Sequence, residues 1–369
     1  MKITTCARTD QRLLQRLQKL RQELTPARAY LLSFPANLRY LSDYSGEAAC
    51  GVLTSHEFYL ITDYRFEQQA LQECANLKVL CRNRDQQTLG AALADIFRQE
   101  AIQQVWYEDF ALTQQSFVAL QAENPGLVWQ PAPDYLQSQR SVKDLAEIAA
   151  LKQAASIADS ALAHCLSYLQ AGISEAEFAL ELEYQMRKRG AEALSFETIV
   201  GFGARSALPH CPPSAQRLRE GDLIVIDFGA KVAGYGSDMT RSYVLGQANT
   251  QQADMYATVS AAQAAALAEL RAGVDAARVN QAANAVLQDS AYSNFASTGL
   301  GHGIGLQLHE FPIITPQLKH QLVAGQVITI EPGIYIPGYG GIRLEDDVLI
   351  TEAGYQLLSH AAKQFELLN

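Results

Sequence analysis

The chain has 369 residues, of which 29 are Lys or Arg and 39 are Asp or Glu, so its formal net charge is −10 and its sequence pI is about 5.2. The length predicts about two domains of roughly 150 residues each. An acidic chain without a run of Lys and Arg is not expected to bind nucleic acid. No stretch approaches the ~20 consecutive apolar residues of a membrane-spanning helix, so no membrane partner is expected either.

The six cysteines are scattered, and no two of them form a Cys-x-x-Cys pair. In a chain of this size, that pattern is typical of reduced thiols in the cytoplasm. The first eight residues, Met-Lys-Ile-Thr-Thr-Cys-Ala-Arg, lack the apolar core of a signal peptide. Together these features predict a cytoplasmic protein.

The first third of the chain alternates helical and strand patterns, which favours a compact α/β domain. Residues 10–24 carry leucines at three- and four-residue spacing, as in an amphipathic helix. The apolar run Ala29–Phe34 predicts a buried strand before Pro35, and Cys50–Thr62 resembles a hairpin. Further helices are expected at Tyr64–Ala75 and Thr88–Ala101, and further strands at Lys78–Cys81 and Gln103–Tyr107.

A domain boundary is expected near residues 124–137, where Asn-Pro-Gly is followed by Gln-Pro-Ala-Pro-Asp. We place it between residues 134 and 135, which gives predicted domains 1–134 and 135–369. The second domain combines runs of strands with runs of helices and lacks strict βαβ repetition, which favours an α+β fold. Its expected helices are Val142–Gln170, Ser174–Arg189, Gln251–Ala272 and Val274–Ser290, and its expected strands are Asp222–Gly229, Met239–Leu245, Val327–Ile330 and Asp347–Ile350.

Two aspartates of the second domain are candidates for a shared site. Asp227 ends the apolar run Leu223–Ile226, and Asp238 follows it by eleven residues. Glycines in the intervening segment allow a hairpin that brings both carboxylates onto one face. Two carboxylates held together repel each other unless a cation or a shared proton lies between them. Either acid alone is more often a turn or cap residue than a functional one.

A histidine and two glutamates extend this set. His302 lies among glycines at alternate positions, which permit close approach of a bound group, and Glu331 and Glu345 each follow a short apolar stretch. These glycines lack the strand-then-helix context of a dinucleotide site. Four carboxylates and one imidazole suit one or two hard divalent ions such as Mn²⁺, with Co²⁺ or Zn²⁺ as alternatives, better than a structural zinc site.

Six motifs carry a resemblance to a known family. In chain order they are Ala-Leu-Pro-His210, Ile-Asp227-Phe-Gly, Ser-Asp238-Met-Thr-Arg, Gly-His302-Gly-Ile-Gly, Ile-Glu331-Pro-Gly-Ile-Tyr and Arg343-Leu-Glu345-Asp. With them the chain resembles the pita-bread metallopeptidases, which include methionine aminopeptidase, Xaa-Pro aminopeptidase and Xaa-Pro dipeptidase (prolidase). The first third, with Pro35-Ala-Asn37-Leu-Arg-Tyr40-Leu and Ile61-Thr-Asp63-Tyr-Arg65, is similar to the creatinase-type N-terminal domain of the Xaa-Pro branch.

The resemblance implies a centre of two divalent metal ions. Asp227 would chelate one ion, Asp238 and Glu345 would bridge both, and His302 and Glu331 would complete the other. In such a pair, the ions lower the pKa of a bound water toward neutrality. By the same resemblance, Glu331 would also accept a proton from the attacking water.

Three further residues match the family's substrate-handling positions. His210 and His309 would bind the peptide, stabilise the tetrahedral intermediate and move a proton to the leaving nitrogen. Arg343 would orient the carboxylates, with a surface salt bridge as the alternative interpretation. Cys211, next to His210, is interpreted as a small buried residue rather than a redox group.

We therefore predict an Xaa-Pro aminopeptidase that acts on small peptides with proline at the second position. The first alternative is the dipeptidase, which needs to hold the carboxylate of an Xaa-Pro dipeptide. A broader aminopeptidase that accepts Met-Ala or Met-Ser, a non-catalytic peptide-binding protein and a non-peptidase member such as creatinase are further alternatives. The resemblance also implies a homodimer.

Overall fold

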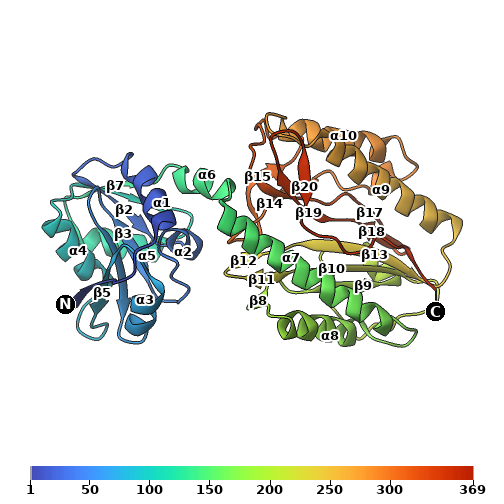
Figure 1. Cartoon of the computed structure of the whole chain (residues 1–369), viewed down its shortest axis with the longest axis horizontal. Helices are drawn as coiled ribbons and strands as arrows, with labels where there is room; N and C mark the ends of the chain where they lie inside the picture. Colours follow the sequence, from blue (N-terminus) through green and yellow to red (C-terminus); the bar gives the residue numbers. More distant parts are fainter. Residues whose placement is uncertain (1, 369) are drawn as a thin grey trace. The chain divides into compact units, whose positions relative to one another are not determined.

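The computed structural model describes residues 2–368, and the chain divides into two compact units between Gln139 and Arg140 (Figure 1). The boundary expected from the sequence, between residues 134 and 135, lies at the start of helix α6 (Tyr135–Ser141) and stays a prediction. None of the helices described between residues 2 and 368 has both the length and the apolar character required to cross a membrane.

Unit 1, the N-terminal unit, is a seven-stranded mixed sheet with the strand order β1-β5-β4-β3-β2-β6-β7. β4 runs parallel to β5, and β2 and β7 run parallel to β6, whereas the other neighbouring pairs are antiparallel. The strands are β1 (Lys2–Thr5), β2 (Arg28–Leu32), β3 (Cys50–Leu53), β4 (Phe58–Asp63), β5 (Lys78–Arg82), β6 (Gln104–Tyr107) and β7 (Val128–Pro131). The helices are α1 (Gln11–Arg21), α2 (Pro35–Ser42), α3 (Glu67–Glu73), α4 (Leu89–Gln99) and α5 (Gln114–Glu123).

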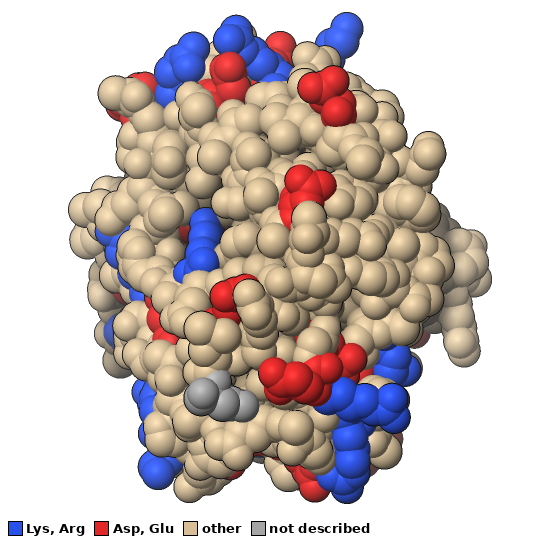
Figure 2. All heavy atoms as spheres, turned by 90° about the vertical axis from the view of Figure 1, so that its right-hand side faces the viewer, with Lys and Arg blue, Asp and Glu red and all other residues tan. Residues whose placement is uncertain are grey.

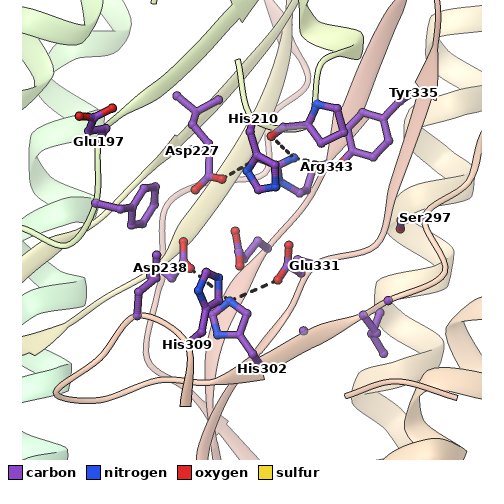
Figure 3. Close-up of a pocket in the computed structure, with 18 of the residues that line it drawn as sticks. Glu197, His210, Asp227, Asp238, Ser297, His302, His309, Glu331, Tyr335 and Arg343 are labelled. Carbon is purple, nitrogen blue, oxygen red and sulfur yellow. Dashed lines mark hydrogen bonds and ion pairs between the residues drawn. The ribbon is translucent and has the colours of Figure 1, made fainter. Parts of the chain in front are cut away.

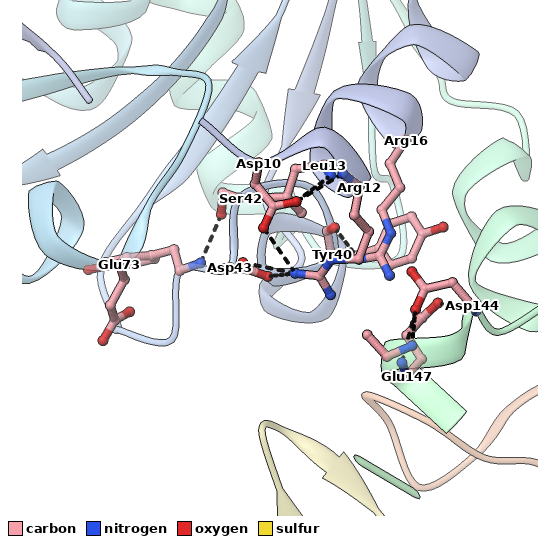
Figure 4. A network of polar contacts seen from close by, with 12 residues as sticks. Asp10, Arg12, Leu13, Arg16, Tyr40, Ser42, Asp43, Glu73, Asp144 and Glu147 are labelled. Carbon is pink, nitrogen blue, oxygen red and sulfur yellow. Dashed lines mark hydrogen bonds and ion pairs between the residues drawn. The ribbon is translucent and has the colours of Figure 1, made fainter. Parts of the chain in front are cut away.

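Local sequence explains why α1 forms and how it is fastened. The Asp10 side chain caps the helix by accepting hydrogen bonds from the backbone of Arg12 and Leu13. The Arg12 guanidinium in turn lies 2.9 Å from both carboxylate oxygens of Asp43, which follows α2 (Figure 4). The leucines of α1 face the core, so the predicted amphipathic helix is confirmed.

The structure corrects the prediction around Pro35. The strand expected at Ala29–Phe34 ends at Leu32, and Pro35 begins α2 instead of closing a strand. Proline suits the first position of a helix because its missing N–H has no partner there in any case. The predicted hairpin over Cys50–Thr62 is confirmed as the antiparallel pair of β3 and β4.

Unit 2 contains two larger sheets, each packed against a pair of helices (Figure 1). One sheet has the order β21-β13-β10-β9 and packs against α7 and α8, and the other has the order β15-β14-β16-β19-β20 and packs against α9 and α10. The small sheets β12-β11-β8 and β17-β18 complete the unit. This mixture of sheets and helix pairs confirms the α+β prediction.

The helices of unit 2 begin with strong caps. Asp144 with Glu147 before α7 (Figure 4), Ser174 with Glu177 before α8 and Asn249 with Gln252 before α9 each form a reciprocal capping pair. The helices are α7 (Leu145–Cys165), α8 (Glu175–Lys188), α9 (Thr250–Glu269) and α10 (Ala276–Gln288), with short 3₁₀ turns η1 (Leu166–Tyr168), η2 (Gly203–Ala207) and η3 (Ser293–Phe295).

The strands of unit 2 agree with the expected ones where the sequence is most apolar. β13 and β16 have the predicted bounds, β10 is one residue shorter than predicted at each end, and β19 begins one residue earlier than predicted. The strands are β8 (Ala193–Leu194), β9 (Ile199–Phe202), β10 (Leu223–Phe228), β11 (Ala230–Val232), β12 (Tyr235–Gly236), β13 (Met239–Leu245), β14 (Gly301–Gly303), β15 (Glu310–Ile314), β16 (Val327–Ile330), β17 (Gly333–Ile336), β18 (Gly340–Arg343), β19 (Asp346–Ile350), β20 (Tyr355–Leu357) and β21 (Glu366–Leu367).

Charge on the surface does not gather into a basic patch on the face shown in Figure 2. There, Lys and Arg side chains form separate small groups with Asp and Glu among them. This face therefore lacks the continuous basic surface that binding to a phosphate backbone requires.

Candidate metal centre and active site

A cleft of about 900 Å³ lies within unit 2 and collects every site residue predicted from the sequence. Figure 3 shows Asp227, Asp238 and Glu331 around a common space, with His210, His302 and His309 beside them. Apolar side chains form much of the remaining wall, among them Phe196, Ile199, Pro212, Pro213, Leu300, Leu308 and Ile313.

The β10–β13 hairpin brings the two aspartates onto one face, as predicted. Asp227 in β10 pairs with Thr240 in β13, and Asp238 stands two residues before Thr240. Side chains two residues apart on a strand share a face, so Asp238 is the diagonal neighbour of Asp227. The turn needs Gly229, because a Cβ there would lie 1.8 Å from the carbonyl oxygen of Ser237.

His302 lies in β14 and presents one ring nitrogen to the acids. Its Nδ1 lies 3.0 Å from the carbonyl oxygen of Gly303, which only accepts, so in that bond Nδ1 carries the proton. The other nitrogen, Nε2, then offers a lone pair at 3.6 Å from Asp238 Oδ2 and 3.5 Å from Glu331 Oε1. This tautomer is the one that neutral histidine uses as a metal ligand through Nε2.

Backbone hydrogen bonds to neighbouring segments fix both glutamates in place. The Glu331 backbone N–H donates to Leu300 O at 2.8 Å, directly after β16, and the Glu345 N–H donates to Thr240 O at 3.1 Å. Ligand atoms of Asp238, His302 and Glu345 lie within 4.8 Å of one another. Side chains from both sheets of unit 2 therefore converge on one point.

The acids of this cluster disfavour one another's charge. Burial raises the pKa of Asp238 well above its usual value, and the neighbouring Glu345 and Asp227 carboxylates raise it further. Burial also raises the pKa of Glu345, with Glu331 and Asp227 adding to the effect. Burial raises the pKa of Glu331 too, against the opposing effect of His302. Without a cation, keeping these buried carboxylates charged costs free energy.

Three carboxylate oxygens of the cluster are buried and receive no hydrogen bond from residues 2–368. They are Asp227 Oδ1, Asp238 Oδ1 and Glu345 Oε1. Burying such an atom without a partner is unfavourable. A divalent cation satisfies oxygen donors of this kind together with the His302 lone pair, so the residues present fit the metal ions that the sequence implies.

Arg343 is buried and fully engaged rather than part of a surface salt bridge. Its Nη2 lies 2.6 Å from Asp227 Oδ2, its Nε donates to Thr240 Oγ1 at 3.0 Å, and its Nη1 donates to Tyr335 Oη at 2.8 Å and Pro209 O at 3.1 Å. Tyr335 and Asp227 raise the pKa of Arg343 against the opposing effect of burial. The guanidinium therefore stays charged and holds Asp227 in place.

His210 and His309 lie on the cleft wall without being bound to the acids. The rings of His302 and His309 meet edge to face with centroids 4.3 Å apart. Partial burial, with His302 and His210 nearby, lowers the pKa of His309. His309 is therefore mainly neutral near pH 7, as a group that exchanges a proton requires.

Sequence reasoning missed the ionic anchor behind His309. The Glu310 carboxylate is buried and accepts from the Gln307 backbone N–H at 2.9 Å, with Arg140 and Lys143 on its other sides. Burial opposes ionisation, but Lys143 and Arg140 bring the pKa of Glu310 below its usual value. The loop that carries His309 is thus pinned to the start of unit 2.

Two threonines beside the acids were also missed, although the strand period could have found them. Thr240 stands two residues after Asp238, and Thr329 stands two residues before Glu331. A two-residue offset on a strand places a side chain on the same face as the acid. Tyr335, which accepts a hydrogen bond from Arg343, ends the motif Ile-Glu331-Pro-Gly-Ile-Tyr, but no role was predicted for it.

Comparison with known proteins agrees with this geometry. The profile described as metallopeptidase family M24 matches residues 149–352, and that of the creatinase/prolidase N-terminal domain matches residues 14–142. An uncharacterised peptidase of Bacillus subtilis is 33% identical over 338 residues, which are 92% of this chain and 95% of that protein.

Two solved structures share the fold over nearly the whole chain. The X-Pro aminopeptidase from Thermotoga maritima superposes with a TM-score of 0.88 at 32% identity, over 94% of this chain and 100% of the other. The Xaa-Pro dipeptidase from Bacillus anthracis superposes with a TM-score of 0.92 at 32% identity, over 96% and 100%. These matches confirm the predicted pita-bread fold with a creatinase-type N-terminal domain.

Proposed function

Because the chain belongs to metallopeptidase family M24, we propose that it is a metal-dependent exopeptidase that hydrolyses the bond between an N-terminal residue and proline. The observation that carries this proposal is the set of buried, unpartnered oxygens of Asp227, Asp238 and Glu345 around the free Nε2 of His302. Such a set is costly in a protein that binds no cation and favourable in one that does.

We propose that the acids and His302 hold two divalent ions, with Mn²⁺ preferred and Co²⁺ or Zn²⁺ as alternatives. Asp227 would hold one ion, His302 and Glu331 would hold the other, and Asp238 and Glu345 would contribute to both. When bound, the ions polarise the scissile carbonyl and lower the pKa of the attacking water.

The protein's own side chains supply the rest of the chemistry. Glu331 accepts the proton of the attacking water, since its carboxylate lines the cleft 3.5 Å from His302 Nε2, beside the proposed ions. His210 and His309 donate hydrogen bonds to the developing oxyanion, and one of them gives a proton to the proline nitrogen as the C–N bond breaks. That histidine then regains the proton that Glu331 took from the water. The proline nitrogen lacks an N–H, and the apolar wall with Pro212 and Ile313 suits its ring.

Charge in the cleft favours the aminopeptidase over the dipeptidase. An Xaa-Pro dipeptide carries a free carboxylate on its proline, which calls for a cation to receive it. Of the described residues that line the cleft, Arg343 is the only Lys or Arg, and Asp227, Thr240 and Tyr335 engage its guanidinium. A longer peptide continues as an amide at that position and needs no such cation.

The dipeptidase remains the second candidate, because the similar structure from Bacillus anthracis bears that name. A broader aminopeptidase that also accepts Met-Ala or Met-Ser fits the same cleft. The proposed cytoplasmic location and homodimer rest on the sequence alone.

The deciding experiment compares Xaa-Pro-Yaa tripeptides with matched Xaa-Pro dipeptides. The protein is stripped with chelator and resupplied with Mn²⁺, and release of the first residue is followed with and without the metal. Metal-dependent cleavage of the tripeptide alone supports the aminopeptidase, and cleavage of the dipeptide alone establishes the second candidate. Absence of cleavage of both peptides with Mn²⁺, Co²⁺ and Zn²⁺ would refute the proposal and favour a peptide-binding role.

A further inference from the structure

We infer that Thr240 and Thr329 are positioning residues that aim the two glutamate ligands of the metal centre, each through a hydroxyl whose direction is fixed from behind. The inference rests on the proposed metal centre. Both threonines lie in strands that border the cleft, Thr240 in β13 and Thr329 in β16, and neither exposes any surface to solvent.

Thr240 receives a hydrogen bond from Arg343 and gives one to Glu345. Arg343 Nε lies 3.0 Å from Thr240 Oγ1, and Thr240 Oγ1 lies 2.7 Å from Glu345 Oε2. A guanidinium nitrogen only donates, so the threonine oxygen is the acceptor in the first contact. The single hydroxyl proton is then left for the glutamate.

Thr329 repeats this arrangement with a different donor. The backbone N–H of His302 donates to Thr329 Oγ1 at 3.1 Å, and Thr329 Oγ1 lies 3.2 Å from Glu331 Oε1. A backbone N–H also only donates, so the hydroxyl proton again points to the carboxylate. The close approach depends on Gly301, since a Cβ there would lie 2.8 Å from Thr329 Oγ1.

The Thr240 hydroxyl occupies one oxygen of Glu345 and leaves the other for a cation, whereas the Thr329 hydroxyl holds the Glu331 oxygen that also lies 3.5 Å from His302 Nε2. At Glu345 the division is visible, because Oε2 receives the Thr240 proton while Oε1 is buried without a hydrogen bond from the described residues. A carboxylate held in this way has less rotational freedom to lose when an ion binds. Outer partners of this kind typically change metal affinity by roughly 10–100-fold.

The two threonines are expected to act on different parts of the centre. Thr240 holds Glu345, which is proposed to bridge both ions, and its donor Arg343 also holds Asp227. Thr329 links His302 to Glu331, and both belong to one ion only. Loss of the Thr240 hydroxyl should therefore weaken the binding of both ions, and loss of the Thr329 hydroxyl should weaken the binding of one.

The test is calorimetric titration of the chelated, full-length protein with Mn²⁺, which needs no substrate. Thr240→Val and Thr329→Val keep the shape of the side chain and remove the hydroxyl, whereas Thr240→Ser and Thr329→Ser keep the hydroxyl. Thr62→Val is the matched control, since Thr62 is also buried, lies in β4 of unit 1 and donates to Ala48 O at 3.3 Å instead of to a proposed ligand.

The expected result has three parts. Thr240→Val raises the dissociation constant of both ions by roughly 10–100-fold, and Thr329→Val does so for one ion. The serine variants and Thr62→Val bind Mn²⁺ as the unaltered protein does. Melting of the metal-free variants is measured in parallel, because a purely structural threonine lowers that melting temperature and leaves Mn²⁺ affinity unchanged.

Unchanged Mn²⁺ affinity in both valine variants would overturn the inference, as would loss of affinity in the serine variants. If Thr240→Val does not fold, the Thr329 pair decides the matter by the same criterion. Failure of the proposed function is recognised separately, because it would appear as absent peptide cleavage in a protein whose unaltered form still binds the metal.

Discussion

Unit 1 and unit 2 both bury carboxylates, but they treat the oxygens in opposite ways. In unit 1, Glu108 is fully buried after β6 and both of its carboxylate oxygens accept hydrogen bonds. Its Oε2 accepts from the backbone N–H groups of Ser33 and Phe34 at 2.6 Å, and its Oε1 accepts from Asn37 Nδ2 at 2.6 Å. The carboxylate thereby caps the start of α2.

In the cleft of unit 2, the donors are placed so that one oxygen of an acid is held and the other is not. Arg343 holds Asp227 Oδ2 and Thr240 holds Glu345 Oε2, whereas Asp227 Oδ1 and Glu345 Oε1 lack donors from the described residues. The difference shows that burial alone does not distinguish a structural acid from a ligand. A ligand is distinguished by carboxylate oxygens that lack hydrogen-bond donors and converge on one point.

The largest expected effect comes from Asp238→Asn, which replaces one oxygen of a proposed bridging ligand by an NH₂ group. We expect kcat/KM on an Xaa-Pro-Yaa tripeptide to fall by on the order of 10³ or more, since metal ions stabilise the transition state by several kcal/mol. The fold should persist, because the substitution relieves repulsion from Glu345 and Asp227. Circular dichroism and steady-state kinetics check both points, and full turnover by the variant would remove Asp238 from the centre.

Glu310→Gln sharpens the comparison inside unit 2, because Glu310 lies beside the cleft and yet is a satisfied acid. The substitution leaves Arg140 and Lys143 without their buried counter-charge, so we expect a loss of about 3 kcal/mol in unfolding free energy at pH 7. Mn²⁺ binding should remain, since the donors of the centre are untouched.

This effect has a defined pH dependence. The folded pKa of Glu310 is lowered by Lys143 and Arg140, so the folded protein binds fewer protons there than the unfolded chain. The stabilisation is present above the unfolded pKa of about 4.3 and disappears as the pH falls through the lower folded pKa. Urea unfolding at pH 7, 4 and 3 should show the variant approaching the unaltered protein only below about pH 4.3, and an equal difference at pH 7 and 3 would contradict this account.

Removal and return of metal probes the unsatisfied oxygens directly. A free Mn²⁺ concentration of 100 times Kd should stabilise unit 2 by about 2.7 kcal/mol for each ion bound, or roughly 5–11 °C per ion for a domain of this size. At a fixed Mn²⁺ concentration the shift should grow as the pH rises, because the raised pKa values of Asp238 and Glu345 make the metal-free fold less stable at higher pH. Calorimetric melts at pH 5.5 and 8 with chelator or Mn²⁺ measure it, and a shift that shrinks with pH would argue against carboxylate ligands.

Glu108→Gln is expected to have the smallest effect of the set. It turns an NH₂ group toward the N–H donors of Ser33 and Phe34, at a cost of about 1–3 kcal/mol. Both tryptophans, Trp106 and Trp129, lie in unit 1, so their fluorescence reports its unfolding. Reduced stability with unchanged Mn²⁺ binding is the predicted result, and weakened Mn²⁺ binding would erase the contrast between the two units.

The sequence predicted those parts of the structure that local patterns determine. The apolar strands around Asp227 and before Glu331, and the glycine-containing hairpin that joins Asp227 to Asp238, could be found because strand period and turn residues are local signals. The convergence of the acids with His302 followed from their shared position at strand ends. Their roles as metal ligands stay predictions.

Features that depend on distant partners could not be found in this way. β1 forms by pairing with β5, which is more than seventy residues away in sequence. α5 lacks a marked apolar face, so its sequence does not indicate a helix. Pro35 is compatible with the end of a strand or the start of a helix, and the Glu108 carboxylate that accepts from the Phe34 N–H before that helix comes from another part of the chain. The hydroxyl directions of Thr240 and Thr329 likewise require donors from other strands.

The central claim is that the unsatisfied oxygens of unit 2 bind divalent metal, and counting ions tests it most directly. The protein is stripped with chelator, equilibrated with Mn²⁺ and freed of unbound metal, and Mn²⁺ per chain is determined by elemental mass spectrometry beside Asp238→Asn. Two ions per chain in the unaltered protein, with a clear loss in Asp238→Asn, is the predicted result. No retained Mn²⁺, or the same content in both proteins, would contradict the account.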